Sequence, residues 1–328
     1  MSSASFDPIG ALSELLQQLP DPSSSPGDRQ IILSGASGRY IARFRRGTGS
    51  YIGMGWSASR ADNAAYLPAA ALLKEAGVHV PDVLLSRDEG DGNGVCLVQD
   101  LGNTRLLDLK GESWRVQRTA YKQAIGEALR LHRSAANPGI VPPFDESLYR
   151  WEQEYFAEHY LGGHLHRSGS DLTNRPEMKR MAAKLASLPR CMVHRDLQSQ
   201  NIMLHGGRAW LIDFQGTRPG LPEYDAASLI FDPYMDLPFE RKMELTKLWE
   251  TCGGRRLDRD IFPLCALQRI MQALGAYAKL WHGEHRKWYR LQLDSGLRSL
   301  EQIAALPQLG EQSQSVLSCL RDAQIIKS

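Results

Sequence analysis

One stretch near the middle of the chain limits the possible folds more than any other. A short apolar run leads into His194-Arg195-Asp196, and Asn201 follows five residues after the aspartate. Two short β-rich runs come next, Ile202–Leu204 and Ala209–Ile212, joined by His205-Gly206-Gly207-Arg208, and the second run leads directly to Asp213. This pattern predicts a β-hairpin. Because the two ends of a hairpin meet at its open side, we expect Asn201 and Asp213 to lie close together.

The polar side chains of this stretch suit the transfer of a phosphoryl group from ATP. That reaction needs a carboxylate to orient the acceptor hydroxyl and take its proton, which is the role expected for Asp196. It also needs oxygen ligands for Mg²⁺, a cation that prefers hard oxygen donors. Asn201 and Asp213 would supply them. The alternative is that all three residues are ordinary turn, cap or loop residues, but the combined pattern favours the site.

Composition narrows the choice of function further. The 328 residues are enough for two modest domains or one large one. A formal net charge of +2 gives no reason to expect a nucleic acid or a membrane as partner. No apolar run approaches the roughly 18 residues of a transmembrane helix, and the N-terminus lacks the layout of a secretory signal. The five cysteines are scattered, without a CxxC pair, so we expect a reduced, cytoplasmic enzyme.

The chain changes character near Gly102. Before this residue, β-rich runs surround one helix at Asp62–Ala76, and a further strand is expected at Val78–Leu85. After it, helical periodicity dominates. We therefore predict an α+β fold with two domains. Residues 1–102 would form a small, mostly antiparallel sheet, and residues 103–328 a larger, mostly helical lobe.

A hairpin is expected at Ile31–Phe44, and its tip consists of small residues. Gly35, Ser37 and Gly38 would expose backbone N–H groups that can approach phosphates closely. Arg39 follows directly. The alternative is an ordinary surface hairpin that binds nothing.

Several phrases of the sequence together resemble a known group of proteins. From about Ile31 to about Ala305 the chain is similar to the aminoglycoside phosphotransferase and choline kinase superfamily, which shares the protein-kinase fold. Val193–Met203 and Leu211–Gly216 look like one branch of it, the anomeric sugar kinases that phosphorylate N-acetylmuramate and N-acetylglucosamine in cell-wall recycling. Many other members carry His, and protein kinases Lys, where this chain has Gln198.

The resemblance implies a protein-kinase-like, two-lobe fold. It also implies an ATP-dependent kinase that phosphorylates the C1 hydroxyl of N-acetylmuramate or N-acetylglucosamine, giving the sugar 1-phosphate for peptidoglycan recycling. Asp196 would be the catalytic base, with Asn201 and Asp213 as magnesium ligands. The turn of Gly35, Ser37 and Gly38 would cover the phosphates. A hinge would contact adenine through its backbone, and it consists of Gln99, Asp100, Leu101 and Gly102.

The sequence departs from this pattern on the third strand. Kinases of this fold usually have a Lys there, paired with a Glu on the next helix. Ser50–Trp56 contains no Lys, and Lys74 and Glu75 lie only near the far end of the helix. Arg39 or Arg43 is the expected substitute, since a guanidinium matches phosphate oxygens. The alternative is that both are solvated strand residues.

The acceptor site is expected between Asp196 and the helices after residue 145. Four polar side chains suit the hydroxyl and acetamido groups of a sugar, and each is also open to a structural role: Gln198, Gln215, Glu154 and Tyr224. A lactyl carboxylate would require a cation, for which Arg218 is the candidate. Asp225 is expected either to cap a helix or to brace the expected catalytic loop, His194–Asn201, and His132 to be a core or buttressing residue.

Two other functions compete with the sugar kinase. The same site could act on an aminoglycoside, choline or another small alcohol. Acidic residues at its mouth would favour such a cationic acceptor, and the candidates are Glu152, Glu154, Glu158 and Asp232. Alternatively, the chain could be a pseudokinase that binds without turnover, which the missing Lys supports and the intact Asp196, Asn201 and Asp213 oppose. The sequence does not define the oligomeric state.

Overall fold

The computed structural model describes residues 6–19, 29–34, 39–57, 61–134, 139, 141–283 and 287–321. The chain divides into two compact units. Unit 1 comprises Met1–Thr104 and Met203–Gly216, and unit 2 comprises Arg105–Ile202 and Thr217–Ser328. Unit 1 contains an antiparallel sheet and unit 2 is mostly helical. The predicted α+β class is therefore confirmed.

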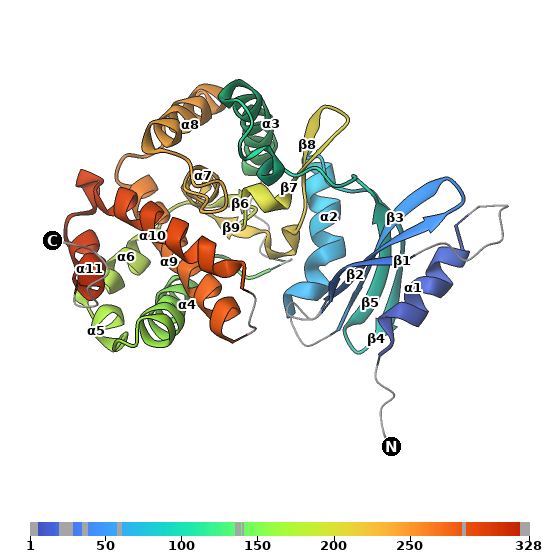
Figure 1. The fold of residues 1–328 in the computed structure, drawn as a ribbon, viewed down its shortest axis with the longest axis horizontal. Helices are drawn as coiled ribbons and strands as arrows, with labels where there is room; N and C mark the ends of the chain where they lie inside the picture. The colour runs from blue at the N-terminus through green and yellow to red at the C-terminus, as the bar shows by residue number, and fades with distance from the viewer. Residues whose placement is uncertain are drawn as a thin grey trace, which may run out of the picture. The chain divides into compact units, whose positions relative to one another are not determined.

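Unit 1 is built on a five-stranded sheet with the order β1-β2-β3-β5-β4 (Figure 1). Its strands are β1 (Arg29–Ser34), β2 (Arg39–Arg46), β3 (Gly49–Trp56), β4 (Val83–Gly90) and β5 (Asn93–Gln99). The antiparallel pairing of β1 with β2 confirms the predicted hairpin over Ile31–Phe44. Its tip, with Gly35, Ser37 and Gly38, lies outside the described residues.

Helix α1 (Pro8–Gln17) covers one face of this sheet (Figure 1). The Asp7 side chain begins the helix by accepting a hydrogen bond from the Ile9 N–H, at 3.0 Å. The apolar face of α1 enters a buried core that contains Leu12, Leu15, Phe44, Val95 and Leu97, and each fully buried leucine contributes about 1.5–3 kcal/mol. A Cβ atom at Gly55 would lie 2.6 Å from the Pro8 Cβ, so glycine allows this close approach of helix and strand.

The hairpin that follows the catalytic loop forms as predicted. Strand β7 (Ile202–His205) pairs with β8 (Arg208–Leu211). Between them, Gly206 and Gly207 have φ values of +58° and +73°, which suit a tight two-residue hairpin turn and which side chains rarely allow.

Most of this hairpin belongs to unit 1 because it is bonded to the segments around the sheet. The Leu211 N–H donates to the His79 carbonyl at 2.8 Å. The Phe214 ring, in the short helical turn η5 (Phe214–Gly216), stacks on Tyr66 with the centroids 4.8 Å apart. Tyr66 starts α2 (Tyr66–Glu75), which follows the turn η1 (Ala61–Ala65). The domain boundary expected at residue 102 does not include this feature: residues 203–216 group with the sheet of unit 1, although they come after the boundary in the sequence.

Unit 2 is assembled around α9 (Ile261–His282), a largely buried helix that packs against α4, η3, α7 and α10 (Figure 1). Two short strands, β6 (Cys191–Val193) and β9 (Arg218–Gly220), pair with each other. The other helical elements are η2 (Leu106–Leu109), α3 (Trp114–His132), α4 (Glu146–Phe156), its π-helical continuation η3 (Ala157–His164), α5 (Ser170–Thr173), α6 (Pro176–Ala186), η4 (Ser199–Asn201), α7 (Pro222–Ile230), α8 (Phe239–Gly253), α10 (Tyr289–Ala304), η6 (Pro307–Leu309) and α11 (Gly310–Arg321).

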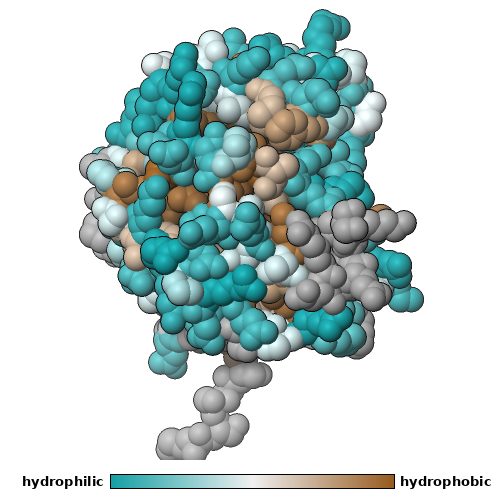
Figure 2. Space-filling view, turned by 90° about the vertical axis from the view of Figure 1, so that its left-hand side faces the viewer, coloured by the Kyte–Doolittle hydropathy of each residue, from teal (hydrophilic) through white to brown (hydrophobic). Residues whose placement is uncertain are grey.

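Hydrophilic side chains make up most of the face shown in Figure 2, and apolar side chains are visible in smaller areas between them. Among the helices of the described ranges, none is long and apolar enough to cross a membrane.

A buried lysine joins α8 to α10. Lys242 is 1 % exposed, and its Nζ donates to Ser299 Oγ at 3.0 Å and to Gln302 Oε1 at 2.6 Å. The ammonium also lies 5.3 Å from the centroid of the Phe231 ring. Burial lowers the pKa of Lys242 to about 8, because the charged form loses its hydration.

This lysine predicts a pH dependence of stability. Between its folded pKa of about 8 and its unfolded pKa of about 10.4, the unfolded chain binds more protons, so the free energy of unfolding rises with pH. From pH 7 to 9.5, wild type is expected to gain about 2 kcal/mol relative to Lys242→Met. Urea unfolding of both proteins at the two pH values measures the difference. Parallel pH profiles would contradict the shifted pKa.

Candidate active site

The catalytic loop begins at the end of β6, and the buried carboxylate of Asp225 on α7 holds its start. One oxygen, Oδ2, accepts from the His194 N–H at 2.8 Å, and Oδ1 accepts from the Arg195 N–H at 2.9 Å. Arg195 has a φ of +75°, a conformation that costs a non-glycine residue about 1–3 kcal/mol. The two hydrogen bonds to the Asp225 side-chain oxygens stabilise this backbone.

His132 completes this arrangement from the end of α3, where its Nε2 lies 2.9 Å from Asp225 Oδ2. The brace expected as one role of Asp225 is therefore confirmed, as is the buttressing role of His132. The alternative role as a helix cap is wrong, because Leu221 is the N-cap of α7. Asp225 lies within the first turn, and its side chain reaches the loop instead.

A second buried carboxylate holds the other end of the loop. Asp232 lies just after α7, and its Oδ2 accepts from the Ser199 N–H at 2.7 Å, while Oδ1 accepts from the Tyr234 N–H at 2.9 Å. Burial raises the pKa of Asp232, and these hydrogen bonds oppose the rise. One short region, α7 and the turn after it, thus fixes the loop on both sides of Asp196.

Asp196 and Asn201 lie in unit 2 and are tied to each other. The Asn201 side-chain Nδ2 donates to the Asp196 carbonyl oxygen at 2.9 Å, so the amide oxygen is the atom that would bind a cation. The Asp196 side chain is 31 % exposed. It is the accessible carboxylate of the braced loop, as the role of a base requires.

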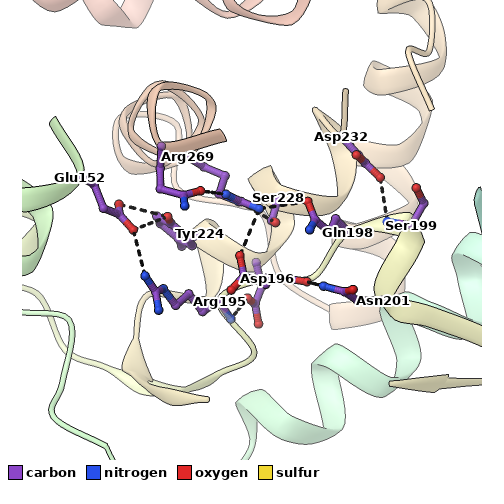
Figure 3. A network of polar contacts seen from close by, with 12 residues as sticks. Glu152, Arg195, Asp196, Gln198, Ser199, Asn201, Tyr224, Ser228, Asp232 and Arg269 are labelled. Carbon is purple, nitrogen blue, oxygen red and sulfur yellow. Dashed lines mark hydrogen bonds and ion pairs between the residues drawn. The ribbon is translucent and has the colours of Figure 1, made fainter. Parts of the chain in front are cut away.

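Arg269 of α9 contacts the Asp196 carboxylate, and sequence reasoning missed it. Its Nη2 lies 3.3 Å from Asp196 Oδ1 and 3.1 Å from Gln198 Oε1 (Figure 3). Gln198 is buried and accepts this bond, so the structure gives it a partner within the protein. The available signal was a charged residue in the apolar run of α9, since a buried charge needs a partner.

Tyr224 and Glu152 form a buried pair behind the loop. The Tyr224 hydroxyl lies 3.0 and 3.1 Å from the two Glu152 carboxylate oxygens, and Gln268 Nε2 donates to Oε2 at 3.1 Å. Arg195 Nη2 is 3.9 Å from Glu152 Oε1. Burial raises the pKa of Glu152, and the Arg195 charge opposes the rise. Tyr224 is fully buried, so its expected contact with a sugar is replaced by a structural hydrogen bond.

Glu154 is exposed, unlike Glu152 two residues earlier on α4. Residues two apart on a helix point in nearly opposite directions, so only one of the two acids can face the interior. Arg218, the expected cation for a lactyl carboxylate, is 6 % exposed. Its guanidinium lies 5.8 Å from the centroid of the Phe144 ring. Glu154 therefore lies on the exposed side of α4, whereas Arg218 is buried beside Phe144.

In unit 1, the predicted metal ligand Asp213 is paired with Arg39. Arg39 Nη2 lies 2.7 Å from Asp213 Oδ1, and Gln215 Nε2 donates to the same oxygen at 3.1 Å. Gln215 was expected to bind sugar, but here it contacts the carboxylate. Among the described residues, Arg39 Nε is buried without a hydrogen-bond partner. Asp213 has a φ of +60°.

Arg43 has a different role from Arg39, because it joins β2 to the predicted hinge. Its Nε and Nη2 contact the two carboxylate oxygens of Asp100 at 2.6 and 3.0 Å, and Nη1 donates to Asn103 Oδ1 at 2.7 Å. Burial alone would raise the pKa of Asp100, but the hydrogen bonds from Arg43 and Ser50 hold it below its usual value. Of the two arginines considered for the phosphates, Arg39 is the one not held by the hinge.

Known structures share this fold. One is a thermostable mutant of an aminoglycoside phosphotransferase in a ternary complex with AMP-PNP and hygromycin B. It is 16 % identical, with a TM-score of 0.56 over 88 % of this chain and 98 % of that chain. The likeness confirms the predicted kinase-like fold. A sequence profile of the phosphotransferase enzyme family matches residues 28–251, and the chain belongs to this family.

Two relatives narrow the comparison within the family. The N-acetylmuramate/N-acetylglucosamine kinase of Pseudomonas aeruginosa is 28 % identical over 306 residues, covering 89 % of this chain and 88 % of the relative. The kinase of the same name from Neisseria meningitidis serogroup B is 26 % identical over 244 residues, covering 69 % and 71 %. The resemblance read from the sequence is confirmed.

Proposed function

We propose that this protein transfers the γ-phosphoryl group of ATP to the C1 hydroxyl of N-acetylmuramate or N-acetylglucosamine in peptidoglycan recycling. The braced loop that presents Asp196 is the observation that carries the proposal. The names of the two relatives support the choice of acceptor. A cytoplasmic location is part of the proposal, since the phosphoryl donor is ATP.

In this mechanism Asp196 orients the C1 hydroxyl and takes its proton. The hydroxyl oxygen forms a bond to the γ-phosphorus, the bond from that phosphorus to the β–γ bridging oxygen breaks, and ADP leaves with the electron pair. The products are the sugar 1-phosphate and ADP. The hinge from Gln99 to Gly102 would contact adenine, and the turn from Gly35 to Gly38 would cover the phosphates.

Asn201 and Asp213 would hold Mg²⁺, which neutralises triphosphate charge when bound. Their amide and carboxylate oxygens are the hard donors that this ion prefers. The hydrogen bond from Asn201 Nδ2 to the Asp196 carbonyl supports this role, because it orients the amide and leaves its oxygen as the ligand atom.

The placement of acidic side chains favours a neutral or anionic acceptor over a cationic one. Glu152 and Asp232, two of the four acids considered for a cationic acceptor, are buried. Glu152 pairs with Tyr224, and Asp232 holds the Ser199 N–H. Both act inside unit 2 and present little charge to a bound aminoglycoside or choline.

Turnover with defined acceptors tests the proposal. Purified enzyme, ATP and Mg²⁺ are incubated with N-acetylmuramate, N-acetylglucosamine, an aminoglycoside panel or choline. ADP release is measured, and ³¹P NMR locates the phosphate, with the Asp196→Asn protein as control. We expect a sugar 1-phosphate. Phosphorylation of only an aminoglycoside or choline would show that the acceptor is not an amino sugar. ATP binding without turnover on any acceptor would show that the protein is a binding module rather than a kinase for these acceptors.

Arg39 is expected to bind the ATP phosphates in place of the missing lysine. Its buried Nε without a partner among the described residues supports this role, since a phosphate oxygen would accept from it. Because a hydrogen bond to a charged group contributes about 1.5–3 kcal/mol, Arg39→Ala should raise the KM for ATP roughly 10- to 100-fold. Initial rates at saturating sugar and varied ATP measure this change.

Lys74→Ala is the matched control for Arg39→Ala. Lys74 is also a cation of unit 1, but its side chain is 69 % exposed, and its Nζ pairs with Asp82 Oδ1 at 2.6 Å. The KM for ATP should stay unchanged in this variant. A raised KM for ATP in Lys74→Ala, together with an unchanged KM in Arg39→Ala, would show that Lys74 rather than Arg39 binds the ATP phosphates.

A further inference from the structure

Arg269 is a buried charged residue of unit 2 that lies in the middle of the apolar helix α9. It is 7 % exposed, and Leu267, Ile270 and Met271 beside it are buried as well. A buried guanidinium is strongly unfavourable unless its donors are satisfied and a negative charge is near. Its partners therefore indicate why an arginine is tolerated there.

The donors of Arg269 are almost fully used within the protein. Nε donates to Ser228 Oγ at 3.0 Å, Nη1 contacts Gln272 Oε1, and Nη2 reaches both Gln198 Oε1 and Asp196 Oδ1 at 3.1 and 3.3 Å (Figure 3). A guanidinium has five N–H groups, so one remains. This arrangement suits a residue that acts through Asp196 better than one that binds a substrate carboxylate directly.

We propose that Arg269 is a positioning residue for the catalytic base: it binds Oδ1 of Asp196 and so directs Oδ2 at the acceptor hydroxyl. The inference rests on the proposed role of Asp196. A carboxylate that can rotate presents its oxygens in many directions, whereas a fixed partner on one oxygen defines the position of the other.

Gln198 is part of the same arrangement. It lies two residues after Asp196, and its Oε1 shares Nη2 of Arg269 with the aspartate. Ser228 of α7 orients the other side of the guanidinium. Since α7 also carries Asp225, the helix that holds the loop backbone also orients the cation that holds the side chain of the base.

Arg269→Met and Arg269→Lys test this role. The methionine variant should lower kcat about 10- to 100-fold, with the sugar KM changed less than threefold. The lysine variant should recover part of kcat, because it keeps a charge but lacks the fork. If the methionine protein does not fold, the lysine variant decides, with an expected kcat below wild type at an unchanged sugar KM.

Lys242→Met is the matched control, since it also removes a buried cation from unit 2, but one that contacts Ser299 and Gln302. At pH 7 its kcat per folded molecule should equal that of wild type. A wild-type kcat in folded Arg269→Met or Arg269→Lys would overturn the proposal. So would a large rise in sugar KM at constant kcat, which would make Arg269 a substrate ligand.

A double-mutant cycle with Asp196→Asn separates this proposal from the proposed function. If Arg269 acts through Asp196, its replacement should have little further effect in the Asp196→Asn protein. Multiplying effects in the double mutant would show that the two residues act independently and would overturn the positioning role. Failure of the proposed function would appear in a different experiment, the turnover assay of the wild-type enzyme, as the absence of sugar 1-phosphate.

Discussion

Asp196→Asn is expected to lower kcat for phosphoryl transfer about 10²- to 10⁴-fold. Asparagine keeps the shape of the side chain and an oxygen for Arg269, which lies 3.3 Å from Asp196 Oδ1. It cannot accept a proton from the acceptor hydroxyl. The fold and the affinity for ATP should therefore be unchanged. Steady-state kinetics and calorimetric titration with ATP measure the two quantities.

Asp236→Asn provides the matched control for this substitution. Asp236 is also a partly exposed carboxylate of unit 2, with a side chain 27 % exposed, and it also pairs with an arginine, Arg298. Its replacement should leave kcat at the wild-type value. An Asp196→Asn enzyme with more than a tenth of the wild-type kcat would rule out Asp196 as the base.

Asp225→Ala should lower both stability and activity. The backbone N–H groups of His194 and Arg195 would lose their acceptors, and each buried donor left unpaired costs about 1–3 kcal/mol. Arg195 would also lose the bonds that stabilise its positive φ. We expect the free energy of unfolding to fall by about 3–5 kcal/mol. Because the loop then relaxes, kcat should fall more than tenfold even at temperatures where the variant is folded.

Urea unfolding and kinetics at low temperature measure these effects, and Asp145→Ala is the control. The Asp145 carboxylate also accepts from a backbone N–H, that of Leu148 at 2.8 Å, but at the start of α4. Loss of this cap should cost about 1 kcal/mol without changing kcat. If Asp225→Ala loses no more stability than Asp145→Ala, the loop does not depend on this brace.

The parts of the site that sequence predicted are those with local causes. The hairpin between Asn201 and Asp213 follows from Gly206 and Gly207, because their positive φ values close a two-residue turn. One local prediction was displaced: the strand expected from Val78 begins at Val83. Pro81 has no N–H group for a ladder, so the chain enters the sheet only after it.

The missed parts depend on contacts between distant segments. Arg269 reaches Asp196 from a helix that carries no motif, and no spacing in the sequence connects the two residues. The burial of Glu152 could have been predicted from the sequence, because this residue shares one helical face with the buried Tyr149, Gln153 and Phe156. The helical period therefore distinguishes it from the exposed Glu154.

The position of both loop braces on α7 and the turn after it has a practical meaning for changing the acceptor. Asp225 and Asp232 come from one continuous segment, so the phosphoryl-transfer loop has its support within α7 rather than in α4 or α10. Libraries that randomise exposed positions of α4, such as Trp151 and Glu154, leave that support intact. Laboratory evolution toward new sugars can therefore keep Pro222–Asp232, His132 and Arg269 constant and vary exposed positions of α4.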